Sequence, residues 1–449
     1  MSPHGMHNFT AQLKDKLIQK ALEDRLRKIA ANGSSQGIQL TQGRQGASGE
    51  IPRDFYHFDL HTGYKLIQTV QEEAKRYDIP STFFNSLSGT ARATVHIGGK
   101  EYVNFASYNY LGLSGDSDVS AAAKAAIDTY GTSASASRIV SGTRPIHEEL
   151  EQALAETYGA EDALTFVSGV LTNMTTIGYL FGPRDLVIHD ELIHNSVLQG
   201  IALAGAKRLS FPHNDWLELD QILVAHRRRY ERVLIVLEGV YSMDGDFPDL
   251  PRFIEVKKRH HSFLMIDEAH SFGVMGQTGG GIREHFGCDS REVDIWMGTL
   301  SKSLASCGGY IVGERALVEH LRYLAPGFLY SVAMPPSVAA AALAALREMQ
   351  REPERVWRLQ ERGRIFLDRA RSVGLNVGRS AGYAVIPVIT GSPLKAARMS
   401  AALFDRGINA QPIGFPAVPE KAARVRFFIS CDHTTEQLED TIREILAVV

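Results

Sequence analysis

Phe263-Leu-Met-Ile-Asp-Glu-Ala-His270 and Val293-Asp-Ile-Trp-Met-Gly-Thr-Leu-Ser-Lys302 are the two stretches that decide the fold. In each of them a short apolar run ends in polar residues. A run that is apolar at nearly every position is typical of a strand buried on both faces, and so of a parallel sheet covered by helices. Because ligands bind at the carboxyl ends of such strands, we expect Asp267 and Lys302 to lie together in one crevice.

Helical stretches alternate with short apolar runs on both sides of these two stretches. The other strands predicted from such runs lie at residues 163–167, 186–188 and 233–237. In the segment that follows residue 345, the predicted elements are a charged helix at 347–371, strands at 384–389 and 424–429, and a closing helix at 435–448. This alternation predicts an α/β protein with a large domain at 118–345 and a small α+β C-terminal domain at 346–449.

The first 117 residues have a different pattern. Apolar residues at helical spacing predict an amphipathic helix over residues 8–30, which either packs on the body or a partner subunit or docks a carrier protein or larger synthase. Residues 31–50, rich in Gly, Ser and Gln, are predicted to be a flexible linker, so that 1–50 form one unit. Residues 51–117 lead into the body and include a predicted hairpin at 93–105.

Composition excludes several classes of protein. The chain has 449 residues, 44% hydrophobic and 22% charged, and its net charge of −3 gives no electrostatic reason to expect nucleic acid or an anionic membrane as partner. No apolar run is long enough for a membrane span, and the N-terminus lacks a signal-peptide pattern. Three cysteines (Cys288, Cys307 and Cys431) form no CxxC pair, which favours a reducing cytoplasm. HExxH, CxxC and GxSxG motifs are absent, so we predict neither a metal site nor a serine hydrolase.

A lysine and an aspartate at neighbouring strand ends are typical of a site that binds an aldehyde cofactor with a pyridine ring. The lysine forms a Schiff base with pyridoxal phosphate (PLP), and the carboxylate pairs with the pyridine nitrogen, so that the ring accepts electrons from a carbanion. The alternative is that Lys302 is a surface lysine. Its position between an apolar strand and the small-residue turn at 305–309, which leads into another strand, favours the cofactor interpretation.

Four motifs occur in order along the chain: Ser107-Tyr-Asn-Tyr-Leu-Gly-Leu113, Glu238-Gly-Val-Tyr-Ser-Met-Asp-Gly245, Asp267-Glu-Ala-His-Ser271 and Gly298-Thr-Leu-Ser-Lys-Ser303. Together they resemble the α-oxoamine synthases, and the resemblance covers about residues 95–449. Residues 414–419 and 424–430 are most similar to the catalytic subunit of serine palmitoyltransferase. Residues 83–110 and 213–216 are similar to α-oxoamine synthase domains attached to polyketide synthases.

The resemblance implies the type I fold of PLP enzymes, with a mostly parallel seven-stranded sheet in the large domain, and a homodimer whose active site is shared between subunits. It also implies a decarboxylative condensation of serine, alanine or glycine with an acyl thioester, giving an α-amino ketone, CO2 and a free thiol. The thioester is acyl-CoA or acyl carrier protein; the polyketide-like resemblance and the N-terminal extension favour the carrier protein.

Residue roles follow from the resemblance. Lys302 would hold the cofactor and move the Cα proton, while Asp267 pairs with the pyridine nitrogen. His270 would bond the phenolic oxygen, and His194 would stack on the ring. The other residues implied to bind the cofactor are Ser168, Gly169 and Val170 through backbone N–H groups, Thr299 and Ser301 near the phosphate or ring, Ser242 near the ring edge, and Ser331 at the neighbouring subunit's phosphate.

Two residues are implied to bind the substrate. Arg426 matches an arginine that grips the substrate carboxylate, a bidentate task that suits its guanidinium, and Asn109 matches an asparagine near the same group. Three positions depart from the family pattern. Asn195 replaces alanine, Val170 replaces an aromatic or bulky residue, and Val332 replaces a hydroxyl residue.

Each residue also has a structural interpretation. His194 and His270 are alternatively hydrogen-bonded core histidines, Asp267 a helix N-cap, and Arg426 a solvated strand-edge charge. For the whole chain, the alternatives are another PLP enzyme of this fold, an aminotransferase or lyase, and a non-catalytic partner subunit that lacks the cofactor lysine. The presence of Lys302, Asp267 and His270 together argues against the partner subunit.

Overall fold

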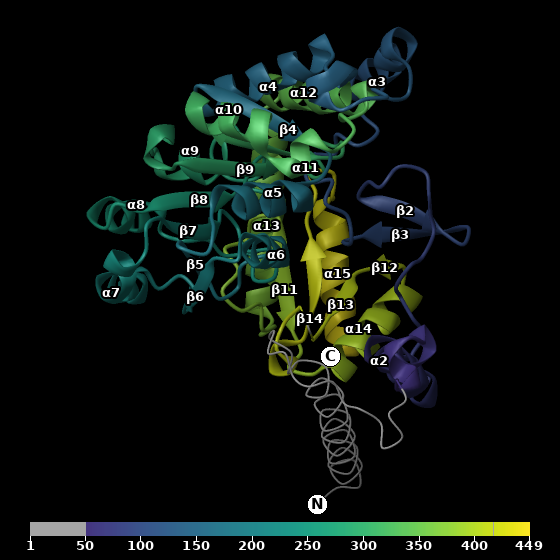
Figure 1. Cartoon of the computed structure of the whole chain (residues 1–449). Helices are drawn as coiled ribbons and strands as arrows, with labels where there is room; N and C mark the ends of the chain where they lie inside the picture. Colours follow the sequence, from purple (N-terminus) through teal and green to yellow (C-terminus); the bar gives the residue numbers. More distant parts are fainter. Residues whose placement is uncertain (1–50, 416) are drawn as a thin grey trace, which may run out of the picture.

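The computed structural model describes residues 51–415 and 417–449, so the predicted helix at 8–30 and the linker at 31–50 lie outside the described residues. Its largest sheet has seven strands in the order β4-β10-β9-β8-β7-β5-β6 (Figure 1). The strands are β4 (Asp162–Phe166), β5 (Leu186–Asp190), β6 (Lys207–Phe211), β7 (Val233–Glu238), β8 (Phe263–Asp267), β9 (Ile295–Thr299) and β10 (Gly309–Gly313). Only β10 runs antiparallel to its neighbours, so the predicted mostly parallel sheet is confirmed.

Both faces of this sheet are buried, as the continuous apolar runs predict. Along β7, Val233, Ile235 and Leu237 belong to one core cluster, while Leu234 and Val236 belong to a second cluster on the other face. Each fully buried aliphatic side chain of this kind contributes about 1.5–3 kcal/mol to folding. Strand β6 was not predicted, because it lies at the edge of the sheet and is largely exposed, so it lacks the apolar run.

Helices cover the two faces of the sheet. They are α3 (Ser117–Tyr130), α4 (Pro145–Tyr158), α5 (Gly169–Leu180), α6 (Asn195–Ala204), α7 (Trp216–His226), α8 (Leu250–Arg259), α9 (Gly281–Phe286), α10 (Arg315–Leu324), α11 (Pro326–Leu329) and α12 (Pro336–Arg351). Helices α5 and α6 pack against each other and follow directly on β4 and β5. Their N-termini therefore lie at the carboxyl edge of the sheet, where the predicted site residues are.

A three-stranded antiparallel sheet forms the centre of the C-terminal part. Its strands are β11 (Val385–Ile389), β14 (Arg424–Phe428) and β13 (Gln411–Ile413), with helices α13 (Glu354–Ser372), α14 (Pro393–Asp405) and α15 (Thr435–Val448). The predicted strands and closing helix agree with these bounds to within a residue. The single helix predicted at 347–371 is wrong: α12 ends at Arg351 and α13 begins after Pro353, because proline suits the start of a helix and not its interior.

The predicted hairpin is formed by β2 (Thr94–Ile97) and β3 (Lys100–Asn104), preceded by η1 (Arg53–Phe55), η2 (Phe58–Leu60), α2 (Thr62–Arg76) and β1 (Leu87–Ser88). Strand β3 pairs with β12 (Ile408–Asn409), so the hairpin joins the C-terminal part (Figure 1). The loop that follows β3 is bonded to the strand β14 region, through Phe428 N to Phe105 O and Cys431 N to Tyr110 O. This loop therefore brings Tyr108 and Tyr110 beside β14.

Among the described residues, none of the helices combines the length and the apolar character that crossing a bilayer needs.

Candidate active site

A cavity of about 300 Å³ lies at the carboxyl ends of the central strands. Among the predicted site residues, those that line it are Ser168, Gly169, Val170, His194, Ser242, Asp267, His270, Thr299, Ser301, Lys302 and Arg426. They come from the ends of β4, β5, β7, β8 and β9 and from β14. The parallel sheet thus brings together side chains that are up to 258 positions apart in the sequence, from Ser168 to Arg426.

Lys302 follows β9, and its ammonium group faces the aromatic ring of Tyr108, with Nζ 5.5 Å from the ring centre. Burial lowers the pKa of Lys302 to about 8; the positive charge of Arg426 adds to this effect, while Asp267 and Glu238 oppose it. A lysine with a pKa of about 8 is partly neutral near neutral pH. It is therefore a competent nucleophile toward an aldehyde and a competent base.

Asp267 ends β8 and is held by two hydrogen bonds. Its Oδ1 accepts from the backbone N–H of Ala269 at 2.9 Å, and its Oδ2 accepts from Nδ2 of Asn173 at 2.8 Å. No helix begins at Asp267, because the next helix, α9, starts at Gly281. The buried carboxylate is thus fixed at the cavity wall rather than serving as a helix cap.

A directed chain of hydrogen bonds connects Asp267 to His194. Asn173 Nδ2 lies 2.8 Å from Asp267 Oδ2 and 2.9 Å from Ser196 Oγ, so the amide donates both of its hydrogens. Ser196 therefore donates its own hydroxyl hydrogen to His194 Nδ1, 2.7 Å away. The hydrogen of the neutral His194 ring then lies on Nε2.

His194 is the N-cap residue of α6. Burial lowers the pKa of His194, and the charges of Lys302 and Arg426 lower it further, while the charge of Asp267 raises it. The ring is therefore neutral and suited to stacking on a flat cofactor. The departure at Asn195 does not affect this geometry, because Asn195 is exposed. Asn173 and Ser196 were not predicted; the available signals were Asn173 one helical turn after Gly169, and Ser196 two residues after His194.

The other end of the cavity is suited to a phosphate. Ser168 caps the twelve-residue helix α5, whose first N–H groups have no partner within the helix. A side chain at Gly169 would come within 3.1 Å of Thr299 Oγ1, so the close approach of α5 to β9 favours glycine there. The hydroxyls of Thr299 and Ser301 both donate to the carbonyl of Gly308, at 2.8 and 3.3 Å.

Arg426, on β14, reaches the cavity from the C-terminal part of the chain. Its Nη1 donates to the carbonyl of Ser242 at 2.8 Å, and its guanidinium lies 4.3 Å from the ring centre of Phe428. Nε of Arg426 is buried and has no partner within the described residues. Arg426 is thus not a solvated edge charge, and its free N–H groups suit a carboxylate ligand.

Glu238 also lines the cavity and was not predicted. Burial, and after it the nearby carboxylate of Asp267, raise its pKa well above the usual value, while the charge of Lys302 opposes this effect. Its Oε2 accepts from Ser242 N at 3.2 Å, whereas Oε1 is buried without a partner among the described residues. Like Arg426 Nε, this atom is available to a polar ligand.

The predicted residues Asn109 and Ser331 do not line the cavity. The amide of Asn109 is used in its own turn, since Nδ2 donates to Ala91 O and Oδ1 accepts from Ser114 N, each at 3.0 Å. Ser331 is half-buried, and its hydroxyl donates to the carbonyl of Val332. The contacts expected of Asn109 with a substrate carboxylate and of Ser331 with a second subunit stay predictions.

His213 ties two of the loops that carry site residues. Its Nδ1 lies 2.9 Å from Oδ1 of Asp190, at the start of the loop that leads to His194. Its Nε2 lies 2.8 Å from Oδ2 of Asp246, on the loop that carries Ser242. Burial lowers the pKa of His213, but the hydrogen bonds and charges of the two carboxylates outweigh it and raise the pKa to about 10. His213 is therefore an imidazolium that holds the two loops together.

We expect His213→Gln to destabilise the protein by about 3 kcal/mol near pH 7, because the change leaves two buried carboxylates without their cation. The folded-state pKa of about 10 lies above the value of 6.5 for an unperturbed histidine. The stabilisation is therefore complete below about pH 6.5 and is lost as the pH rises through 10. Urea unfolding from pH 6 to 10 should show the free energies of unfolding of wild type and His213→Gln converging.

His260→Gln is the control, because His260 bonds the less buried Asp220, and its loss should cost under about 1 kcal/mol. A difference that stays constant up to pH 10 would show that His213 is not charged.

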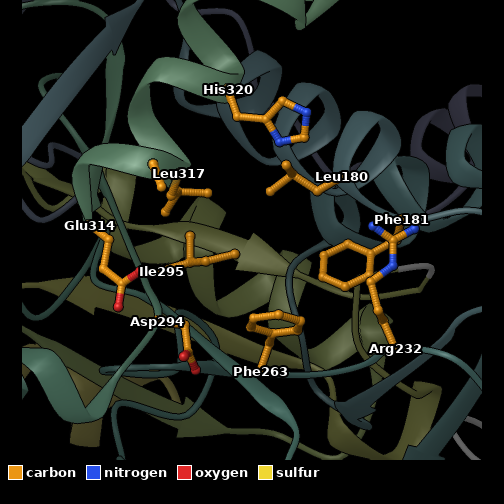
Figure 2. Close-up of a pocket in the computed structure, with 10 residues that line it drawn as sticks. Leu180, Phe181, Arg232, Phe263, Asp294, Ile295, Glu314, Leu317 and His320 are labelled. Atoms are coloured by element: carbon orange, nitrogen blue, oxygen red, sulfur yellow. The ribbon is translucent and has the colours of Figure 1, made fainter.

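Figure 2 shows residues that line a second cavity, of about 270 Å³. Phe263 and Ile295 are among them and are the first residues of β8 and β9, so this cavity lies at the opposite edge of the sheet. Its lining is mainly apolar and includes Phe181 and Phe263, whose rings lie edge to face with their centres 6.2 Å apart. Because this edge is remote from the carboxyl ends of the strands, the second cavity is separate from the site that holds Lys302.

The residues of the first cavity fit PLP. A partly neutral lysine, a fixed carboxylate on the adjacent strand, a neutral histidine and a helix N-terminus are the groups that hold its aldehyde, pyridine nitrogen, ring and phosphate. Among the described residues, three side chains that line this cavity each have a buried polar atom without a partner, and these atoms leave capacity for a polar substrate beside it: Asn173 Oδ1, Glu238 Oε1 and Arg426 Nε.

Comparison with known proteins agrees with this geometry. Residues 100–445 match the family of aminotransferase class I and II. The chain is 42% identical over 346 residues to 8-amino-7-oxononanoate synthase of Symbiobacterium thermophilum, covering 77% of this chain and 88% of the relative. It is 39% identical over 379 residues to the enzyme of the same name from Fervidobacterium nodosum, covering 84% and 95%.

Solved structures give the same result. Serine palmitoyltransferase from S. paucimobilis, whose structure holds PLP joined to myriocin, superimposes with a TM-score of 0.83 at 30% identity, covering 87% of this chain and 98% of that one. The Sphingomonas wittichii serine palmitoyltransferase has the same score, identity and coverage. The chain belongs to the aminotransferase class I and II family and, within it, to the α-oxoamine synthases. Its fold is the type I fold of PLP enzymes, and its cofactor is PLP.

Proposed function

We propose that the protein condenses a small amino acid, serine, alanine or glycine, with an acyl thioester and releases CO2 and a free thiol. The observation that carries this proposal is the convergence of Lys302, Asp267 and Arg426 on one cavity. Bound PLP supplies an electron sink for the negative charge that develops at the amino acid's Cα. Arg426 binds the substrate carboxylate, and Asp267 provides the negative charge that pairs with the pyridine nitrogen.

Lys302 is the residue that moves protons. Its neutral Nζ removes the proton from Cα, which is favoured by the pKa of about 8. A carbon–carbon bond then forms between Cα and the acyl carbonyl carbon, while the carbon–sulfur bond breaks and the sulfur leaves as a thiolate, which takes a proton from water to become the free thiol. The bond from Cα to the carboxylate carbon breaks next, CO2 leaves, and Lys302 returns the proton to Cα.

The acyl carrier is either coenzyme A or acyl carrier protein, and we propose the carrier protein. The support is the resemblance to polyketide-associated synthases and the sequence of residues 1–50, which lie outside the described residues. We also propose a homodimer that acts in the cytoplasm. Beside Ser331, the side chains of Tyr330 and Val332 are 87% and 53% exposed, which suits contact with a second copy.

The proposal is tested by incubating the purified protein with PLP, glycine, L-alanine or L-serine, and an acyl donor on coenzyme A or on a carrier protein. We expect equal amounts of CO2 and free thiol with one amino acid. Transfer of the amino group with neither product would make the protein an aminotransferase. A colourless protein that takes up no PLP would make it a non-catalytic partner subunit.

We expect Arg426→Lys to raise the KM for the amino acid about 10- to 100-fold and to change kcat much less. Lysine keeps the charge but cannot form the bidentate pair, a loss of about 1.5–3 kcal/mol. Steady-state kinetics with varied amino acid measures this. Arg424→Lys is the matched control, because Arg424 lies two residues away on the same strand but pairs with Asp244 outside the cavity. An equal rise in both variants would mean that Arg426 acts only through the turn it holds.

A further inference from the structure

His270 is a buried histidine whose ring is fixed on several sides. Its ring is nearly parallel to that of Phe428, with the ring centres 6.2 Å apart and the planes 10° from each other. It meets the ring of Tyr108 edge-on, with the ring centres 6.1 Å apart. The titratable groups that face it are Tyr108, Tyr110, Lys302, Arg426 and His194. Burial lowers the pKa of His270 well below its usual value, and the charges of Lys302 and Arg426 lower it further, so the ring is neutral. A neutral imidazole carries one hydrogen, on either Nδ1 or Nε2.

The hydroxyl of Tyr110 decides which nitrogen carries it. Tyr110 Oη lies 2.7 Å from His270 Nδ1, and its side chain is fully buried. Burial also raises the pKa of Tyr110, so that it keeps its hydrogen. Within the described residues, no other acceptor lies within hydrogen-bond distance of this oxygen. Because a buried hydroxyl that donates to nothing is costly, the hydrogen goes to Nδ1.

We propose that Tyr110 is a positioning residue that holds His270 as the Nε2–H tautomer, so that His270 donates a hydrogen bond to the phenolic oxygen of PLP. The proposal rests on the proposed function and deepens it. His270 lines the cavity with Lys302 and Asp267, and Nε2 has no partner among the described residues. The other tautomer would turn a lone pair toward the phenolic oxygen, and two acceptors would repel each other.

The bond also crosses the fold. Tyr110 lies on the loop that follows β3, whose backbone is bonded to Cys431 just beyond β14, while His270 follows β8 of the large sheet. The nitrogen of His270 that carries the hydrogen is thus determined by a residue on a loop that is bonded to the C-terminal part of the chain.

The first test is the Tyr110→Phe variant of the PLP-loaded protein, with the cofactor's absorbance followed as a function of pH. A donor on the phenolic oxygen reduces its negative charge, and so weakens its hold on the proton of the neighbouring nitrogen that joins PLP to Lys302. Without the Tyr110 hydroxyl, the His270 hydrogen is free to move to Nδ1, away from the phenolic oxygen. Tyr110→Phe should therefore raise the pH midpoint of the absorbance change by about one unit, the size of one hydrogen bond. An unchanged midpoint would overturn the proposal.

Tyr158→Phe is the matched control. Tyr158 is equally buried, and its hydroxyl donates to Glu268 at 2.6 Å, outside the cavity. Both variants lose one buried hydroxyl and some thermal stability, but only Tyr110→Phe should move the midpoint. Equal shifts in the two variants would mean that the effect is structural.

A double-mutant cycle tests whether Tyr110 acts through His270. In a His270→Gln background the ring nitrogens are gone, so adding Tyr110→Phe should produce no further shift. A further shift of about one unit in that background would show that Tyr110 acts on the cofactor directly, and would contradict the proposal.

The wild-type protein gives a measurement that does not depend on any variant folding. Nitrogen-15 NMR of the full chain, labelled at histidine and free of PLP, should show the His270 hydrogen on Nε2. A hydrogen on Nδ1 would overturn the proposal. This result is separate from the proposed function, which fails instead if the protein takes up no PLP or releases no CO2.

Discussion

Lys302→Ala is expected to lose turnover by roughly 10⁴-fold or more and to lose the visible absorbance of the lysine-bound cofactor. The variant has neither the nucleophile that holds PLP nor the base that moves the Cα proton, and proton transfer alone is worth about 10²–10⁴-fold. The measurements are CO2 release and the absorbance spectrum after adding PLP and removing the excess.

Lys257→Ala is the control for Lys302→Ala. Lys257 is also a mostly buried lysine, but it pairs with Asp294 at 2.9 Å and does not line the cavity. We expect it to keep its spectrum and its turnover. Wild-type turnover in Lys302→Ala would refute the assignment of the active site.

Asp267→Asn is expected to lower kcat about 10³-fold and to leave the KM for the amino acid within a few-fold. The amide has the same shape but no charge to pair with the pyridine nitrogen, and the loss of one preorganised electrostatic group costs about 10²–10³-fold. The variant keeps Arg426, for which we propose the role of binding the substrate carboxylate, so substrate binding should change little. Steady-state kinetics separates the two constants.

Glu268→Gln is the matched control for this variant. Glu268 is the next residue and is fully buried, but its carboxyl bonds Tyr158 and the backbone of Ile282 rather than facing the cavity. We expect its kcat to stay within about tenfold of wild type, well short of the loss expected for a catalytic group. Equal losses in both variants would show that Asp267 matters only for packing.

Strand ends were predictable because their signals are local. The apolar runs of β7, β8 and β9 are continuous in the sequence, so the positions of Asp267 and Lys302 follow from the rule for parallel sheets. Motif resemblance added His194, His270 and Arg426, all of which line the cavity.

The partners of these residues were not predictable, because each depends on contacts between distant segments. Tyr110 and His270 are 160 positions apart, and Asn173 and Asp267 are 94 apart. Nothing in the sequence around Asn173 or Glu238 shows that a carboxylate or a lysine packs against it. Strand β6 was missed for a related reason: an edge strand is half-exposed, so its composition resembles that of a loop.

The place of β10 in the sheet has a consequence for protein synthesis. Strand β4 leads to the N-terminus of α5, for which we propose a role in binding the phosphate. Among the described strands it pairs only with β10, which begins 143 positions after β4 ends. A growing chain therefore makes Ser168 early but cannot fix β4 in the sheet until residues 309–313 have left the ribosome. Long-range pairing of this kind forms late, so a nascent chain acquires its capacity to hold PLP only after most of it has been translated.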